Sequence, residues 1–221
     1  MPRKPRTDVG GFIYHVLNRG NGRQRLFHKP ADYEAFLAVL REAGERYPVD
    51  CLGLCLMPNH WHLVLRPRED GVLGAFMRWV GVTHVRRHHE HYRTRGGGHL
   101  YQGRYKDFIV QDDRHFLLLM RYVESNAVRA KLCERAEDWR WSSACGERSD
   151  AWPALADWPV DRPRNWAATL NREIPEAEAE RVRTSLAKGR PLGEDSWVEK
   201  LSKRLDLGHT LRGPGRPRKN Q

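Results

Sequence analysis

The chain has 221 residues, enough for one ordinary domain with an extension or for two small ones. Lysine and arginine total 39 against 28 acidic residues, and a net charge of +11 favours a nucleic-acid partner, because each neutralised phosphate releases counterions; a merely soluble basic protein is the alternative. No stretch approaches the ~18 apolar residues of a membrane helix, so we expect no membrane span, no signal peptide and a cytoplasmic, nucleoid-associated protein.

Apolar alternation and helical spacing predict seven elements before residue 131. We expect strands over 12–18, 49–56, 60–66 and about 105–111, and helices over 31–47, 72–92 and 112–130. The glycines after Arg19 and the prolines at 48 and 58 separate the first of these elements. The order β-α-β-β-α-β-α is that of a ferredoxin-like α+β fold with one added helix.

After about residue 145 the composition changes. Prolines and tryptophans fill an irregular stretch, and two short helices are expected at about 175–188 and 194–205. We therefore predict a domain over 1–145 and a basic, mostly helical extension over 146–221. The final residues, 212–221, are too rich in glycine, proline and charge to pack a core.

Two histidines share one face of the third predicted strand. Strands have a period of two, so His60 and His62 point away from the face that carries Trp61, Leu63 and Leu65. Two imidazoles at this spacing can reach one metal ion. The pattern alone is also typical of exposed or hydrogen-bonded histidines, and both interpretations stay open on this feature.

A tyrosine and an amide lie together on the last predicted helix before residue 131. Tyr122 and Asn126 are four residues apart beside the apolar stripe, and Arg129 lies on the same side. A partly buried tyrosine bonded to solvent is the alternative. Together with the histidines, however, a divalent ion could bind a scissile phosphate and orient it for attack by the tyrosine, which is a poor nucleophile by itself.

Four segments in chain order resemble the successive motifs of the single-tyrosine HUH transposases, and in particular the branch of REP-associated tyrosine transposases. They are Tyr14–Asn21, Leu56–Leu63, Tyr101–Lys106 and Arg121–Ala130, and the resemblance runs from about residue 12 to Ser143. The stretch 189–199 also resembles the C-terminal extension of some members. One departure is Ala127, where the family commonly has proline; we expect it to affect local geometry and not chemistry.

The resemblance implies an HUH nuclease domain and a role for each matching residue. It identifies His60, His62 and Asn126 as ligands of Mg²⁺ or Mn²⁺ and Tyr122 as the nucleophile. It implies a transposase that cuts and rejoins single-stranded DNA by transesterification, through a 5′-phosphotyrosine link, near a REP-like hairpin. In some relatives the tyrosine serves a partner's histidines; in this branch a monomer is expected, with a dimer as the alternative.

Further residues are expected to contact DNA. Arg19 belongs to the first matching motif, and Arg129 lies on the same side of the last predicted helix as Tyr122. Arg104, Tyr105 and Lys106 place cations beside an aromatic ring, a mixture suited to stacking bases and pairing phosphates; an ordinary hairpin is the alternative. The tail with Arg216, Arg218 and Lys219 resembles an AT-hook, which would enter the minor groove of A·T-rich duplex. A basic tail held by phosphates alone is the alternative.

Three rival functions remain. A domesticated, non-catalytic DNA-binding protein could keep the fold, but it would not need His60, His62, Tyr122 and Asn126 together. An HUH replication initiator or relaxase would share the metal histidines, whereas the short motifs around Tyr14 and Tyr122 favour a transposase. A metal-dependent hydrolase that uses water would have no use for Tyr122.

Overall fold

A computed structural model describes residues 6–212, and all four predicted strands and the predicted helices form within a few residues of expectation, save one helix. The strands are β1 (Ile13–Arg19), β2 (Val49–Met57), β3 (His60–Pro67) and β4 (Lys106–Val110). The helices are α1 (Pro30–Arg46), α2 (Val72–His91), α3 (Arg114–Glu124), α4 (Asn126–Arg129), α5 (Trp166–Leu170), α6 (Glu176–Lys188) and α7 (Asp195–Arg204).

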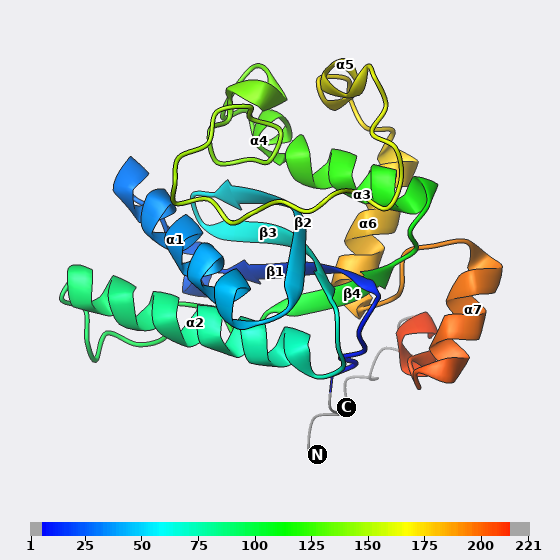
Figure 1. Cartoon of the computed structure of the whole chain (residues 1–221), viewed down its shortest axis with the longest axis horizontal. Coiled ribbons are helices and arrows are strands. Elements are labelled where there is room, and N and C mark those ends of the chain that lie inside the picture. Colours follow the sequence, from blue (N-terminus) through cyan, green and yellow to red (C-terminus); the bar gives the residue numbers. More distant parts are fainter. Residues whose placement is uncertain (1–5, 213–221) are drawn as a thin grey trace, which may run out of the picture.

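The four strands form one antiparallel sheet in the order β2-β3-β1-β4. Helices α1 and α2 cover one face of this sheet and α3 covers the other (Figure 1). The prediction of a ferredoxin-like fold with an added helix is therefore confirmed. The added helix, α3, turns a two-layer fold into a three-layer one, and this places a polar site between the sheet and α3.

Each face of the sheet has its own apolar core. On the α1/α2 face, Trp61, Leu63 and Leu65 of β3 pack with Phe36 and Val80 of the two helices. The other core joins the opposite side of the same strands to the buried stripe of α3. Because β3 alternates between these cores, His60 and His62 necessarily face α3 and not α1 or α2.

The extension covers both edges of the sheet, which would otherwise offer unpaired backbone groups. At the β2 edge, Leu155 pairs with Cys51, and Trp158 donates its indole N–H to the carbonyl of Leu52 at 2.9 Å. At the β4 edge, Leu192 accepts from Gln111 and donates to the carbonyl of Ile109 at 2.8 Å. The extension thus completes the sheet's hydrogen bonding.

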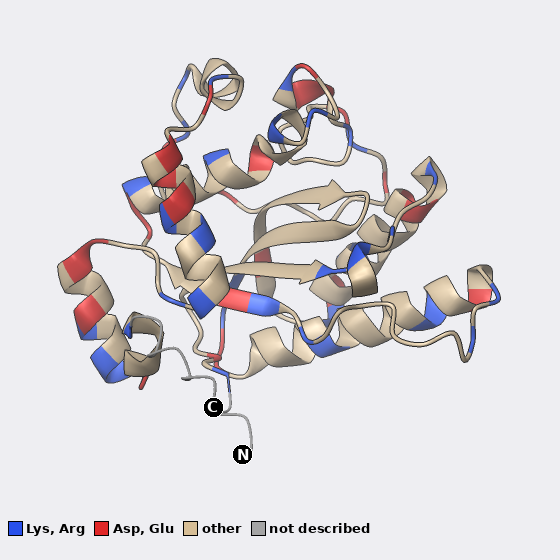
Figure 2. Cartoon of the chain, turned by 180° about the vertical axis from the view of Figure 1, so that it is seen from behind, with Lys and Arg blue, Asp and Glu red and all other residues tan. Residues whose placement is uncertain are grey.

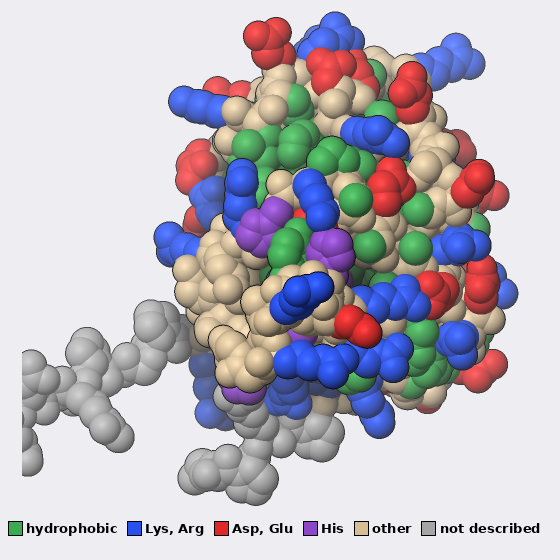
Figure 3. Space-filling view, turned by 90° about the vertical axis from the view of Figure 1, so that its left-hand side faces the viewer, with side chains coloured by type: hydrophobic (Ala, Val, Ile, Leu, Met, Phe, Trp, Pro, Cys, Tyr) green, Lys and Arg blue, Asp and Glu red, His purple; other side chains and the backbone are tan. Residues whose placement is uncertain are grey.

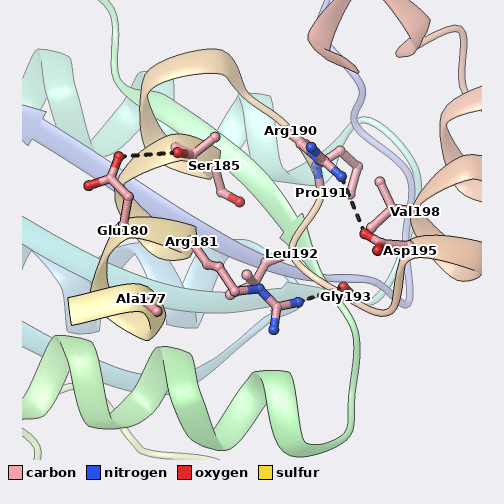
Figure 4. A pocket seen from close by; sticks show the side chains of 11 residues that line it. Ala177, Glu180, Arg181, Ser185, Arg190, Pro191, Leu192, Gly193, Asp195 and Val198 are labelled. Carbon is pink, nitrogen blue, oxygen red and sulfur yellow. Dashed lines mark hydrogen bonds and ion pairs between the residues drawn. The ribbon is translucent and has the colours of Figure 1, made fainter. Parts of the chain in front are cut away.

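Helix α6 holds the β4-covering segment in place. Arg181 donates a hydrogen bond to the carbonyl of Gly193 at 3.1 Å, as Figure 4 shows, and also contacts His115 of α3. Arg190 pairs with Asp195 across the same pocket, whose volume is about 360 Å³. Both arginines are engaged within the protein, so this pocket is a packing feature of the extension.

Residues beyond 145 share the two cores of the sheet. Trp152 and Leu201 pack on the α1/α2 side, and Trp166 and Val182 pack on the α3 side. The predicted division at residue 145 is thus not marked by a separate apolar core, and it stays a prediction. No helix formed by residues 6–212 has the length and apolar character needed to cross a lipid bilayer.

Candidate active site

The site lies at the end of the sheet where β1 finishes and β3 begins. His60 is paired with Arg19 and His62 with Leu17 across the β1–β3 ladder, so all four side chains point to the α3 face. His62 is buried and His60 is half-buried, with ring centroids 5.1 Å apart. Figure 3 looks onto this end of the molecule, where histidine, lysine and arginine side chains gather.

The helix predicted over 112–130 is wrong as one continuous helix, because it breaks at Ser125. Helix α3 ends at Glu124 and α4 begins at Asn126. The Ser125 hydroxyl donates to the carbonyl of Arg121 at 2.6 Å, a local side-chain bond that bends or ends helices. Ala127 therefore lies in the first turn of α4, where proline is also tolerated, so the departure from the family pattern needs no other change.

The break does not separate Tyr122 from Asn126. The Asn126 amide lies 2.7 Å from Nε2 of His62, and the Tyr122 ring lies 6.2 Å from the His62 ring, nearly perpendicular to it. Tyr122 and Asn126 are both buried. The structure thus brings Tyr122 and Asn126 to His60 and His62, although about 60 residues of sequence separate the two pairs.

Arg129 packs against the face of the Tyr122 ring. Its guanidinium carbon lies 3.8 Å from the centre of the Tyr122 ring, and the group donates to the Tyr122 carbonyl at 2.9 Å. Arg19 is half-buried across the site, and its Nε has no hydrogen-bond partner among residues 6–212. Two guanidinium groups therefore lie near the histidines, and the Nε–H of Arg19 is buried without a partner among residues 6–212.

The histidines of the site are held neutral. Burial, aided by the positive charges of Arg19 and Arg129, lowers the pKa of His60 to about 4. Burial and the neighbouring His15 lower the pKa of His62 well below its ordinary value. Neutral imidazoles keep a lone pair for a metal ion at physiological pH.

The residues present fit a divalent ion. Nδ1 of His60 lies 2.7 Å from the Asn59 amide oxygen, an acceptor, so Nδ1 carries the proton and Nε2 keeps its lone pair. The amide of Asn126 can turn its oxygen toward the metal, since its two ends are similar in shape. Within residues 6–212 no cluster of three His, Cys, Asp or Glu side chains could hold a metal. The amide of Asn126 is the further donor that lies against His62.

His15 is a residue of this site that the sequence analysis missed. It is fully buried, and its Nε2 lies 2.8 Å from Nδ1 of His62, with the Phe108 ring packed 4.9 Å away. Its Nδ1 has no partner among the described residues. The signal was available, because the period of two puts His15, Leu17 and Arg19 on one face of the first strand.

The remaining predicted DNA contacts differ in their surroundings, and three of them lie outside the described residues. Lys106 pairs with Leu17 in the sheet, and both Lys106 and Arg104 are exposed. Tyr105 is half-buried, and the Arg6 guanidinium covers its ring at 3.8 Å. Arg216, Arg218 and Lys219 fall outside residues 6–212.

Comparison with known proteins identifies relatives of this chain. The family described as IS200-like transposases matches residues 8–126. A Haemophilus influenzae protein named as a REP-associated tyrosine transposase is 23% identical over 153 residues, which cover 64% of this chain and 83% of that protein.

A solved structure shares the fold. It is that of a REP-associated tyrosine transposase bound to a REP hairpin, and it is 17% identical. The match has a TM-score of 0.53 and covers 74% of this chain and 99% of the solved one. The coverage reaches beyond the family-matched segment, so part of the extension belongs to the shared architecture.

Proposed function

The chain belongs to the family of IS200-like transposases, and on this premise we propose that it is a REP-associated tyrosine transposase that cuts and rejoins single-stranded DNA. The reaction is a metal-dependent transesterification through a 5′-phosphotyrosine intermediate. The substrate is a single strand with an imperfect hairpin of the REP type. The similar solved protein, which is bound to a REP hairpin, supports this choice of substrate.

One observation carries the proposal: a tyrosine and an amide on adjoining helical turns meet two neutral histidines of a strand. Asn126 lies 2.7 Å from His62 Nε2, and the Tyr122 ring stands edge-on to the same imidazole. His60, His62 and Asn126 would hold Mg²⁺ or Mn²⁺. When bound, such an ion would polarise the scissile phosphate and neutralise the charge that develops on it.

Tyr122 performs the bond exchange. Its phenolic oxygen attacks the phosphorus, an O–P bond forms, and the bond to the 3′ oxygen breaks. The phenol proton leaves to solvent and the departing 3′ oxygen gains one, so the products are a 5′-phosphotyrosine and a free 3′-hydroxyl. Because the bond energy stays in the phosphotyrosine, a 3′-hydroxyl can reverse the step and reseal the strand without ATP.

Arg19 and Arg129 receive the phosphate. The unpaired Nε of Arg19 is a charge-assisted donor beside His60, and phosphate oxygens are its natural acceptors. Arg129 stacks on Tyr122 and fixes the ring while it contributes positive charge. Both groups would contribute positive charge where negative charge develops on the phosphate during attack.

His15 positions His62. An imidazole that ligates metal through Nε2 must carry its proton on Nδ1, and in metal sites a second residue usually accepts that proton. Nε2 of His15 lies at hydrogen-bond distance from this atom. Histidine, nucleophile and amide all come from one chain, which supports a monomer as the active unit.

The test is a covalent adduct. The protein is incubated with Mn²⁺ and single-stranded hairpin oligonucleotides from the flanks of its own gene, and the products are separated on denaturing gels. We expect an adduct with wild type and none with Tyr122→Phe, which should still bind DNA.

Tyr47→Phe is the matched control, because Tyr47 is half-buried near the end of α1 on the other face of the sheet. It should form the adduct at wild-type yield. Normal adduct formation by Tyr122→Phe would end the proposed mechanism.

A further inference from the structure

A groove of about 780 Å³ runs beside the exposed face of α2, between this helix and the segment 103–105 that leads into β4. Small residues of α2, among them Gly74 and Gly81, keep it open. Met77, Val82 and Val85 give it apolar walls, and the Val82 side chain is 64% exposed. Large apolar side chains so exposed are uncommon in this protein; among residues 6–212, Leu132 is the other one.

The rim of the groove carries unpaired positive charge. Arg78, Arg86 and Arg104 line it, and none of them forms a hydrogen bond or ion pair within residues 6–212. The neighbouring Arg87, outside the groove, is by contrast paired with Glu42 through two hydrogen bonds. Lys and Arg bands on α2 and at the start of β4 are visible in Figure 2.

The acid that lines the groove is already engaged. Asp8 accepts hydrogen bonds from the backbone N–H groups of Leu73 and Gly74, in the first turn of α2. The positive end of the helix dipole partly balances its charge. The groove therefore combines apolar walls with three guanidinium groups that have no hydrogen bond among residues 6–212, and this charge is suited to an anionic polymer.

One end of the groove lies at Asn18, the residue before the end of β1, and the candidate active site lies on the other face of this strand. Asn18 lines the groove and donates to the carbonyl of Gly103 at 3.2 Å. The next residue, Arg19, points to the opposite face of β1 and lies across the ladder from His60. A DNA strand held at Arg104 would reach the histidines by crossing the end of β1 and the segment 101–103 that is hydrogen-bonded beside it.

We propose that this groove binds the single-stranded DNA that adjoins the cleavage point. Unpaired bases can contact the apolar walls while their phosphates pair with Arg78, Arg86 and Arg104, a combination that single-strand binders use. The bases of a duplex are stacked on one another, so their faces could not contact Val82. The inference rests on the proposed function for its substrate, and it adds the path of the strand and a role for α2.

The test measures DNA binding by the full chain in EDTA, so that no cleavage step is involved. The probes are a fluorescein-labelled hairpin with about 10 unpaired flanking nucleotides and the same hairpin without them. Arg78→Ala/Arg86→Ala should lower the log–log salt slope for the flanked probe by about 0.7 per lost phosphate contact. Val82→Asp should weaken the same binding at least tenfold.

Arg164→Ala and Leu132→Asp are the controls. Arg164 is exposed and unpaired within the described residues and precedes α5, on the other side of the sheet from α2 (Figure 1), and Leu132 is 43% exposed. Both variants should bind the flanked probe like wild type. Thermal melting confirms that all four variants fold.

Two outcomes would overturn the proposal: an unchanged salt slope in the double variant, or an equal loss with the unflanked hairpin, which would assign the groove to duplex. Binding in EDTA does not depend on the chemistry of Tyr122. A result that contradicts DNA binding by the groove is therefore distinct from a result that contradicts cleavage through Tyr122. A wild type that forms no adduct but shows the slope change would keep the groove and lose the proposed reaction.

Discussion

Neighbouring residues of β3 enter two buried polar networks that differ in completeness. On the α1/α2 face, the Trp61 indole donates to the Tyr101 hydroxyl at 2.9 Å, and this hydroxyl also bonds His84 at 2.6 Å. On the α3 face, His62 lies between His15 and Asn126. The first network is enclosed by aromatic side chains, whereas the second opens toward Arg19, whose Nε has no partner among residues 6–212.

The difference shows how burial of histidine can serve structure or chemistry. Burial lowers the pKa of His84 to about 3, as it does for His15. Both groups are therefore neutral, and pKa alone does not separate them. What separates them is their neighbours: His84 bonds the Tyr101 hydroxyl, whereas His15 lies against His62, with Asn126 and Tyr122 beyond it.

Removal of the histidines on the α3 face should abolish activity. We expect His60→Ala and His62→Ala each to lose cleavage to background and to lose Mn²⁺ binding in calorimetry, because only Asn126 and one imidazole remain. Asn126→Ala should be milder, since water can replace a neutral amide ligand. Cleavage at the wild-type rate by either histidine variant would show that this face of β3 does not carry the metal site.

His15 and His84 provide a matched pair of buried histidines on opposite faces. His15→Phe should weaken Mn²⁺ binding about 10–100-fold, the usual effect of losing a residue that orients a ligand. His15→Gln should restore much of this affinity, since its amide can accept from His62. His84→Phe should leave Mn²⁺ affinity unchanged. Equal metal affinity in His15→Phe and wild type would remove His15 from the site.

Acid should destabilise the fold through protonation of the buried histidine His84. Because the pKa of folded His84 is about 3 and lies below its unfolded value, the unfolded chain takes up a proton that the folded chain refuses. Stability due to neutral His84 is thus fully present above about pH 6.5 and is lost as the pH falls toward 3, at up to ~1.4 kcal/mol per pH unit.

Denaturant unfolding between pH 7 and 4 checks this expectation. His84→Phe should have a shallower pH slope than wild type, even if it is less stable at pH 7 by ~1–3 kcal/mol because Tyr101 loses a partner. An unchanged slope would mean that His84 gains no proton on unfolding.

Among these changes, removal of the basic tail should have the smallest effect on DNA cleavage. Truncation should start at residue 213, because Leu207 packs against the α1/α2 core and Thr210 is buried. Loss of Arg216, Arg218 and Lys219 should weaken duplex binding and lower its salt slope by up to ~0.9 per lost phosphate contact. Cleavage of saturating single strands should stay unchanged.

A minor-groove hook predicts a larger loss on A·T-rich than on G·C-rich duplex. Equal losses would indicate a basic tail held by phosphates alone. A collapse of single-strand cleavage at saturation would place the tail within the active site.

Period-two and helical patterns were sufficient to predict the sheet, the two helices on one face and the face of His60 and His62. They could not predict the helix break, because it depends on a bond from the Ser125 hydroxyl to the carbonyl of Arg121, one turn earlier. Nor could they predict how Leu155 and Leu192 cover the sheet edges, since isolated bridges leave no alternating pattern. His15 was missed although the pattern contained it, because the pairing with His62 is set by the register of β1 on β3.

The most direct measurement is to identify the residue that carries DNA after cleavage. Wild-type protein is trapped with a 5′-labelled single-stranded hairpin substrate in Mn²⁺, digested, and analysed by mass spectrometry. We expect a nucleotide phosphate on the peptide that contains Tyr122 and a free 3′-hydroxyl on the released strand. A phosphate attached to another tyrosine, such as Tyr105, or cleavage without any covalent link, would contradict this expectation.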